Sequence, residues 1–241
     1  MARSRARAIC QPHQPMPTAL LIRHAQASFG SADYDVLSEL GHRQVDALAA
    51  AFERRGIGAD RVVTGPARRQ RDTARHWVAA RGDGARVDPR WDEYDDADVL
   101  THYSTTTARV ERRPDDASPA MSSREFQVLL DEALRGWVAD GADSPSPQTY
   151  PDFLERVTAA FADLTDGLGS GETALAFTSS GVIAALAASL IGQPAAFVAL
   201  NRVTVNTGVT KVVLGRQGTT LVSFNEHSHL EEAGPDLVTY R

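Results

Sequence analysis

Short apolar runs alternate along this chain with longer segments that repeat their apolar residues at helical spacing. Residues 18–22 form the first apolar run and residues 39–55 the first helical segment, and the same pair recurs at 61–64 and 67–81. Strand-length runs that alternate with helices predict a parallel sheet with helices on both faces. The pattern therefore predicts an α/β fold, specifically a three-layer α/β/α sandwich.

The C-terminal part of the chain predicts further strands and an antiparallel edge. Residues 173–178 are predicted to form a strand that runs through two serines and a glycine into a helix from Val182 to Leu190. Residues 209–214 and 219–224 are two strand-like runs around a turn bounded by glycines, which is typical of a hairpin. We expect a mostly parallel sheet with its ligand site at the carboxyl ends of the strands.

The middle of the chain lacks this alternation. Residues 82–120 are rich in Asp, Pro, Gly, Ser and Thr and show little periodicity, so we expect weak order there, above all at 104–120. Two helical segments follow. One begins at a capping-box pattern of Ser122 and Glu125, and the other begins at Pro151.

These elements fit one domain of residues 18–241, with residues 94–170 as a helical cap inserted into it. Residues 1–17 are predicted to be a flexible leader, because polar residues follow the early arginines where a secretion signal needs an apolar run. The one cysteine, Cys10, excludes an intramolecular disulfide, and a reducing cytoplasm is the expected location.

Charge and hydropathy argue against two classes of partner. The formal net charge of -6 disfavours broad nucleic-acid binding, which needs a basic surface to displace counterions from phosphates. The longest apolar stretch, around residues 182–191, is about half the ~20 residues that a membrane helix needs. We expect neither a nucleic acid nor a membrane as partner, and the oligomeric state stays open.

One motif follows the first predicted strand. Residues 21–26 are Leu-Ile-Arg-His-Ala-Gln, which places Arg23 and His24 where the strand ends and a loop begins. The segment resembles the Arg-His-Gly-Glu/Gln signature of the histidine phosphatase (phosphoglycerate mutase-like) superfamily. Ala25 stands in place of the usual glycine.

A second motif follows the second predicted strand. Residues 64–74 contain a proline, two adjacent arginines and a Thr-Ala pair. They resemble the second motif of the same superfamily, in which a proline and a later arginine precede a Thr-Ala pair. Counting back from that pair selects Arg69 over Arg68 as the arginine of the motif.

The resemblance extends over about residues 18–230. Residues 37–41 resemble the loop before the first helix of the superfamily, and a Trp-Asp-Glu segment that ends at Glu93 resembles the part that bears its catalytic carboxylate. Glu93 is the acid that the resemblance selects. Asp92 and Asp95 stay open as alternatives, because a run of acidic residues is usually a solvated loop.

The resemblance implies a role for each of these residues. An imidazole can attack phosphorus, and a phosphohistidine intermediate splits one difficult displacement into two easier ones, so His24 is the implied nucleophile. Arg23 and Arg69 would grip the nonbridging phosphoryl oxygens. Glu93 would protonate the leaving alkoxide and then activate water.

The chain departs from the superfamily pattern at Ser179. The superfamily normally has a second histidine there that helps to hold the phosphoryl group, whereas a serine offers one hydrogen bond and no charge. We predict that Ser179 binds phosphate with reduced turnover, and helix capping by Ser179 and Ser180 is the alternative. Backbone N–H groups of the Val182 helix, or His227 or His229, are further candidates for the missing stabilisation.

The leading interpretation is a phosphomonoester hydrolase that acts on a small phosphorylated substrate through a phosphohistidine on His24. No spacing of His, Asp and Glu demands a metal, so we expect no metal and no other cofactor. A phospho-ligand-binding protein with weakened catalysis is the main alternative. A phosphoglycerate-type mutase lacks identifiable substrate contacts, and a serine hydrolase elbow at Ser179 is disfavoured because Phe177 replaces its first glycine.

Overall fold

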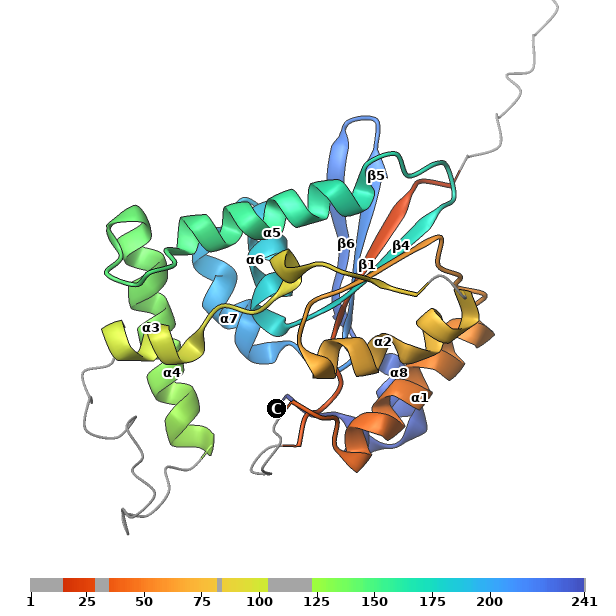
Figure 1. Cartoon of the computed structure of the whole chain (residues 1–241), viewed down its shortest axis with the longest axis horizontal. Helices are drawn as coiled ribbons and strands as arrows, with labels where there is room; N and C mark the ends of the chain where they lie inside the picture. Colours follow the sequence, from red (N-terminus) through yellow and green to blue (C-terminus); the bar gives the residue numbers. More distant parts are fainter. Residues whose placement is uncertain (1–14, 29–34, 82–83, 104–122, 241) are drawn as a thin grey trace, which may run out of the picture.

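The fold is built on one mixed β-sheet with helices on both faces (Figure 1). The computed structural model describes residues 15–28, 35–81, 84–103 and 123–240. The strands are β1 (Thr18–Arg23), β2 (Arg61–Thr64), β3 (Arg86–Val87), β4 (Thr173–Thr178), β5 (Val209–Gly215) and β6 (Gly218–Glu226). The helices are α1 (Glu39–Arg54), α2 (Arg68–Arg81), α3 (Asp96–Tyr103), α4 (Ser123–Asp140), α5 (Tyr150–Thr165), α6 (Ser180–Leu190), α7 (Phe197–Val203) and α8 (Ser228–Ala233).

The strand order is β3-β2-β4-β1-β5-β6, which confirms the predicted parallel sheet with an antiparallel edge. β3, β2, β4 and β1 run parallel, whereas β5 pairs antiparallel with β1, and β6 with β5. At the centre, Ile22 of β1 lies beside Phe177 of β4. Because β1, β2 and β4 point in one direction, the loops after Arg23, Thr64 and Thr178 open at the same edge.

Side chains alternate across the central strands and divide the core into two layers. Leu20 and Ile22 of β1 join the cluster formed with α1 and α2, whereas Ala19 and Leu21 join the cluster formed with α4, α5, α6 and α7. In Figure 1, α1 and α2 lie on one side of the sheet and α5 and α6 on the other. The predicted three-layer α/β/α sandwich is therefore confirmed.

Helix starts follow local signals in the sequence. The Ser38 hydroxyl accepts a hydrogen bond from the Gly41 N–H in the first turn of α1, as serine commonly does at an N-cap. Thr149 and Asp152 form a capping box at the start of α5. With this cap, α5 begins one residue before the predicted Pro151. Separately, α6 begins two residues before the predicted Val182.

The prediction of weak order across residues 82–120 is wrong for the part that contains β3 and α3. β3 pairs with the end of β2, and α3 packs against α4. Between them, the Asp88 carboxylate accepts hydrogen bonds from the backbone and guanidinium of Arg90, which hold its pKa well below the usual range. Tertiary pairing and local ion pairs leave no periodicity in a sequence. Residues 104–122, with the predicted Ser122 cap, lie outside the described residues.

The described part of residues 94–170 contains three α-helices that pack differently. α3 and α4 pack against each other, and Figure 1 shows them away from the sheet, whereas α5 lies along its face. The boundaries of the cap and of the domain stay predictions. Of the predicted leader, residues 1–17, only residues 15–17 are described, and there the Pro17 carbonyl accepts a hydrogen bond from the backbone of Leu214.

Candidate functional site

The sheet itself positions the backbone of His24. The His24 N–H donates to the Thr178 carbonyl of β4 at 2.8 Å, so the chain stays paired one residue beyond β1. On the other side, Asn206 Nδ2 donates to the His24 carbonyl at 3.0 Å. The loop after β1 is therefore held between β4 and the loop that leads into β5.

The hydrogen bonds of the His24 ring define its tautomer. Nδ1 lies 2.8 Å from the Ala25 carbonyl, and because a carbonyl only accepts, Nδ1 carries the proton. Nε2 then accepts a hydrogen bond from Arg69 Nε at 3.3 Å. Burial, followed by the positive charges of Arg23 and Arg69, holds the pKa of His24 well below its usual range. The imidazole is neutral at neutral pH, with its lone pair on Nε2.

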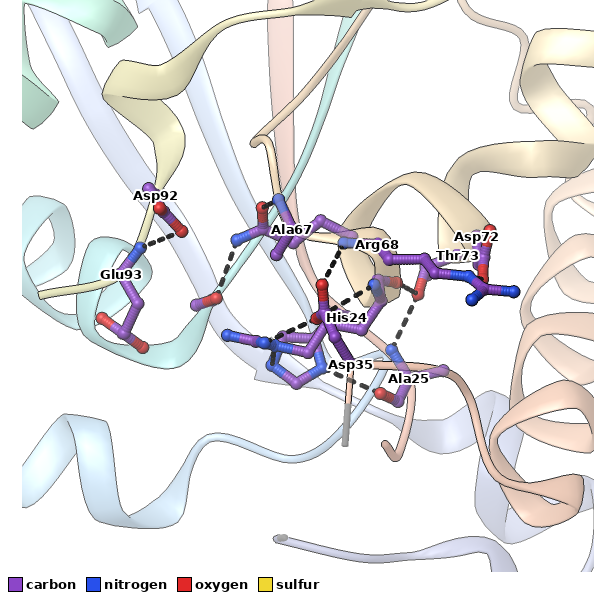
Figure 2. A network of polar contacts seen from close by, with 12 residues as sticks. His24, Ala25, Asp35, Ala67, Arg68, Asp72, Thr73, Asp92 and Glu93 are labelled. Atoms are coloured by element: carbon purple, nitrogen blue, oxygen red, sulfur yellow. Dashed lines mark hydrogen bonds and ion pairs between the residues drawn. The ribbon is translucent and has the colours of Figure 1, made fainter. Parts of the chain in front are cut away.

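Arg69 is fixed at the start of α2, as the second motif predicts. Its guanidinium forms an ion pair with Asp35 at 2.7 Å, and its carbonyl accepts a hydrogen bond from the Thr73 hydroxyl at 2.6 Å. The Thr73 oxygen also accepts from the Ala25 N–H at 2.9 Å, so α2 is tied directly to the loop that bears the histidine (Figure 2). The neighbouring Arg68 side chain is 53% exposed, against 17% for Arg69.

Arg23 is buried and held by the C-terminal part of the chain. Its Nη1 donates to the Tyr240 carbonyl at 2.7 Å and to the Thr204 carbonyl. These two carbonyl oxygens orient the guanidinium. Arg23 therefore contributes a positive potential beside His24.

Glu93 lies across the site on a separate segment (Figure 2). Its Oε2 accepts a hydrogen bond from the Gly181 N–H at 3.0 Å, and its Oε1 from the Tyr94 N–H at 3.2 Å. Burial raises the pKa of Glu93 to about 7, although both N–H donors and the two pocket arginines oppose this rise. The Gly181 N–H at the start of α6 thus donates to Glu93. The sequence instead suggested that backbone N–H groups of this helix would donate to phosphate.

One pocket of about 430 Å³ joins these groups. Its wall contains Arg23, His24, Arg69 and Glu93, so four of the predicted site residues meet there. Asp92 and Asp95, the alternative acids, are not part of that wall. The other lining residues are Ala27, Tyr94, Asp96, Gln127, Leu130, Ser180, Asn201, Arg202, Asn206 and Tyr240.

Ser179 does not line this pocket. Its side chain is 1% exposed, and its hydroxyl accepts a hydrogen bond from Gln70 Nε2 at 2.8 Å. It occupies the N-cap position of α6, yet its side chain makes no capping hydrogen bond. Ser180 is the serine on the pocket wall. Phosphate binding by Ser179 stays a prediction; the bond from Gln70 uses the hydroxyl oxygen as acceptor and leaves the O–H as the donor for such a contact.

The two C-terminal histidines also lie outside the pocket wall. His229 is buried, and its Nε2 pairs with the Thr207 hydroxyl at 3.0 Å. His227 donates through Nδ1 to the Asn225 carbonyl at 2.7 Å. The structure therefore does not bring either of them to His24 as a replacement for the missing histidine.

Sequence reasoning missed Asn206, which is 1% exposed and reaches both the site and the C-terminus. Its Nδ2 donates to the His24 carbonyl, and its Oδ1 accepts from the Thr239 hydroxyl at 2.9 Å. The next residue, Thr207, has a positive φ of 58°. The one available signal was the Asn-Thr-Gly turn before a strand, because asparagine and glycine favour turns.

The described ranges hold neither a candidate metal site nor a candidate membrane-spanning helix. No three His, Cys, Asp or Glu side chains of those residues are grouped as a metal ion would require. Nor does any described helix have the length and apolarity needed to cross a membrane.

Solved structures share this fold. A mycobacterial glucosyl-3-phosphoglycerate phosphatase with inorganic phosphate is 22% identical, with a TM-score of 0.58 over 88% of this chain and 98% of its own. The α-ribazole phosphatase from Shigella flexneri is 20% identical, with a TM-score of 0.57 over 87% and 96%. A mutant phosphoserine phosphatase from Entamoeba histolytica with phosphoserine is 15% identical, with a TM-score of 0.53 over 89% and 100%.

Comparison at the level of sequence agrees with the fold. No curated protein matches the chain. The family described as the histidine phosphatase superfamily (branch 1) matches residues 19–227, which is most of the sequence. This protein therefore belongs to branch 1 of the histidine phosphatase superfamily.

Proposed function

We propose that this protein is a phosphomonoester hydrolase that forms a phosphohistidine on His24. The observation that carries the proposal is the meeting in one pocket of a neutral imidazole and a protonatable carboxyl, His24 and Glu93. Arg23 and Arg69 line the same pocket and supply positive charge for the phosphoryl oxygens.

In the first step, His24 Nε2 attacks phosphorus, and the bond from phosphorus to the ester oxygen breaks. The Glu93 carboxyl gives its proton to that oxygen, so an alcohol leaves rather than an alkoxide. In the second step, the Glu93 carboxylate takes a proton from water while the water oxygen attacks phosphorus. The bond from phosphorus to Nε2 then breaks, which releases phosphate and restores neutral His24 and protonated Glu93.

The electrostatics of the pocket suit both steps. The lowered pKa of His24 keeps Nε2 unprotonated, so its lone pair can turn from the Arg69 N–H to phosphorus. The raised pKa of Glu93, about 7, lets the carboxyl give and take a proton near neutral pH. The guanidinium groups of Arg23 and Arg69 can neutralise the phosphoryl charge as it moves. No step calls for a metal or another cofactor, and we propose that the enzyme uses none.

A small phosphorylated molecule fits this pocket best as substrate. Its volume of about 430 Å³ lies in the range of ordinary small-molecule sites. Related folds have been solved with inorganic phosphate and with phosphoserine, which supports the same class of ligand.

The second candidate is a phospho-ligand-binding protein with weak turnover. It is favoured by Ser179, whose hydroxyl is engaged by Gln70 at the position where the superfamily normally has a histidine. A serine hydrolase is not favoured, because the buried Ser179 hydroxyl contacts an amide donor rather than a histidine base.

Phosphate release tests the proposal. Wild type, His24→Ala and His76→Ala are incubated with p-nitrophenyl phosphate and a panel of phosphomonoesters in the presence of a chelator. His76 is an exposed residue of α2 paired with Asp46, so it serves as the matched control. We expect wild type and His76→Ala to release phosphate and His24→Ala to lose about 10³-fold or more. If wild type binds vanadate but hydrolyses no ester, the ligand-binding function stands instead.

A further inference from the structure

Glu93 lies on a strap, residues 90–94, which starts in the short 3-10 helix Pro89–Trp91 and is irregular after it; Arg156 of α5 contacts its backbone. Arg156 Nη1 donates to the Arg90 carbonyl at 2.8 Å and to the Asp92 carbonyl at 2.9 Å. Its Nη2 lies 3.4 Å from the Glu93 carbonyl. One guanidinium therefore contacts three carbonyls of a five-residue segment that has no helical or strand pairing at Glu93.

Thr178 and the aromatic core also contact the strap. The Trp91 carbonyl points the other way and accepts from the Thr178 hydroxyl at 2.6 Å. Tyr94 closes the strap by packing against Trp137 and Phe153 at centroid distances of 5.5 and 5.9 Å. Arg156 thus contacts the carbonyls of Arg90, Asp92 and Glu93, and Thr178 contacts that of Trp91.

Arg156 is itself held in place by α5. Its guanidinium lies 5.0 Å from the centroid of the Phe153 ring, which is a favourable distance for a cation–π contact. Phe153 is fully buried in the core cluster. The guanidinium is therefore anchored to the core, and a lysine could not reproduce its planar set of donors.

We propose that Arg156 is a positioning residue for proton transfer, because it fixes the strap that aims Glu93 into the pocket. Arg156 does not line the pocket and touches no reacting group. The inference rests on the proposed role of Glu93 as general acid. It assigns to α5, a helix outside the pocket wall, an indirect effect on the chemistry through Glu93.

The test compares two esters whose leaving groups differ in their need for a proton. The p-nitrophenolate ion leaves without protonation, whereas a simple alkyl phosphate needs Glu93 as acid. For Arg156→Met we expect kcat/KM, which reports the steps up to the phosphohistidine and not its hydrolysis, to fall by about 10- to 100-fold on the alkyl ester and by less than about threefold on p-nitrophenyl phosphate. Arg156→Lys keeps the positive charge but not the planar set of guanidinium donors. Its activity on the alkyl ester should lie between that of wild type and that of Arg156→Met.

Arg61→Met is the matched control. Arg61 likewise contacts three backbone carbonyls, through Nη1 alone: those of Asp163, Leu164 and Asp166 at the C-terminal end of α5. It lies at the other end of the helix from the strap, so its loss should lower stability without changing the ratio of the two esters. An equal loss on both esters in Arg156→Met, or the same ratio change in Arg61→Met, would overturn the proposal.

Hydrogen–deuterium exchange separates this proposal from the proposed function. Wild type that hydrolyses neither ester would refute the phosphatase function by itself. Even then, Arg156→Met should raise amide exchange within residues 90–94 by about tenfold or more relative to Arg61→Met. Unchanged exchange in that segment would contradict the positioning role whatever the activity.

Discussion

The two residues proposed for catalysis are held by different kinds of structure. His24 follows a central strand, and backbone pairing with β4 continues through its own N–H. Glu93 lies on the strap of residues 90–94, which is held mainly by side chains from α5, β4 and α7. The nucleophile therefore depends on the sheet, whereas the acid depends on a few side-chain contacts that substitutions outside the pocket can remove.

This difference predicts that changes near Glu93 affect proton transfer more than phosphoryl transfer. The largest effect is expected for Glu93→Gln, which should lower kcat on alkyl phosphates by about 10²- to 10⁴-fold. Because the free-enzyme pKa of Glu93 is about 7, kcat/KM of wild type should fall as pH rises above 7, and the variant should lack this fall. Steady-state pH profiles measure both.

Asp95→Asn is the control for Glu93→Gln, because Asp95 is an exposed acid at the start of α3. It should keep wild-type kcat within about twofold. A fall as large as that of Glu93→Gln would move the acid role from Glu93 to Asp95.

On the nucleophile side, Arg69→Met should lower kcat/KM by about 10²- to 10³-fold on every phosphomonoester, including p-nitrophenyl phosphate. The reason is that Arg69 contacts His24 Nε2 and lines the pocket. Arg68→Met is the neighbouring control, since Arg68 is exposed and paired with Asp72, and it should change kcat/KM by less than about threefold. Similar losses in both variants would contradict the assignment of Arg69.

Gly181→Ala tests whether catalysis depends on the close packing of Glu93 and Tyr94 against the start of α6. A Cβ at Gly181 would lie 2.2 Å from Glu93 Oε1 and 2.5 Å from the Tyr94 ring, so the strap must shift. We expect kcat on alkyl phosphates to fall by about 10- to 100-fold. Gly58→Ala, where a Cβ meets open space, should leave it unchanged. Wild-type kcat in Gly181→Ala would show that the position of Glu93 is not critical.

The pH dependence of the unfolding free energy tests the raised pKa of Glu93. A folded pKa of about 7 above the usual 4.5 means that the fold prefers neutral Glu93, so this contribution is present below pH 4.5 and lost as pH rises through 7. Between pH 5 and pH 8, wild type should therefore lose about 1–2 kcal/mol of unfolding free energy relative to Glu93→Gln. Urea unfolding at both pH values measures the difference, and parallel pH dependence of the two proteins would contradict the raised pKa.

The smallest effect on activity is expected for Ser179→Ala. Its hydroxyl faces Gln70 rather than the pocket, so kcat/KM should fall by less than about threefold, with a loss of about 1 kcal/mol in stability. A tenfold loss of kcat/KM without a change in stability would instead support the predicted contact with phosphate.

The same difference explains which features the sequence could predict. β1, β2 and β4 have apolar runs of their own, and the Arg-His and Arg69 motifs sit directly beside strands, so the positions of His24 and Arg69 followed from pattern and resemblance. The strap, β3 and α3 depend on partners distant in sequence, such as Arg156, and carry no periodicity. The orientation of Ser179 likewise depends on Gln70, a contact across 109 residues that no local pattern records.

A rapid-quench labelling experiment tests the central claim most directly. Wild type and Glu93→Gln are mixed with a 32P-labelled phosphomonoester, quenched in alkali, which preserves phosphohistidine, and digested for peptide mapping. Label should appear on the peptide that contains His24, should persist longer in Glu93→Gln because water is no longer activated, and should be absent from His24→Ala. Turnover without label on His24, or label on another residue that survives in His24→Ala, would contradict the phosphohistidine mechanism.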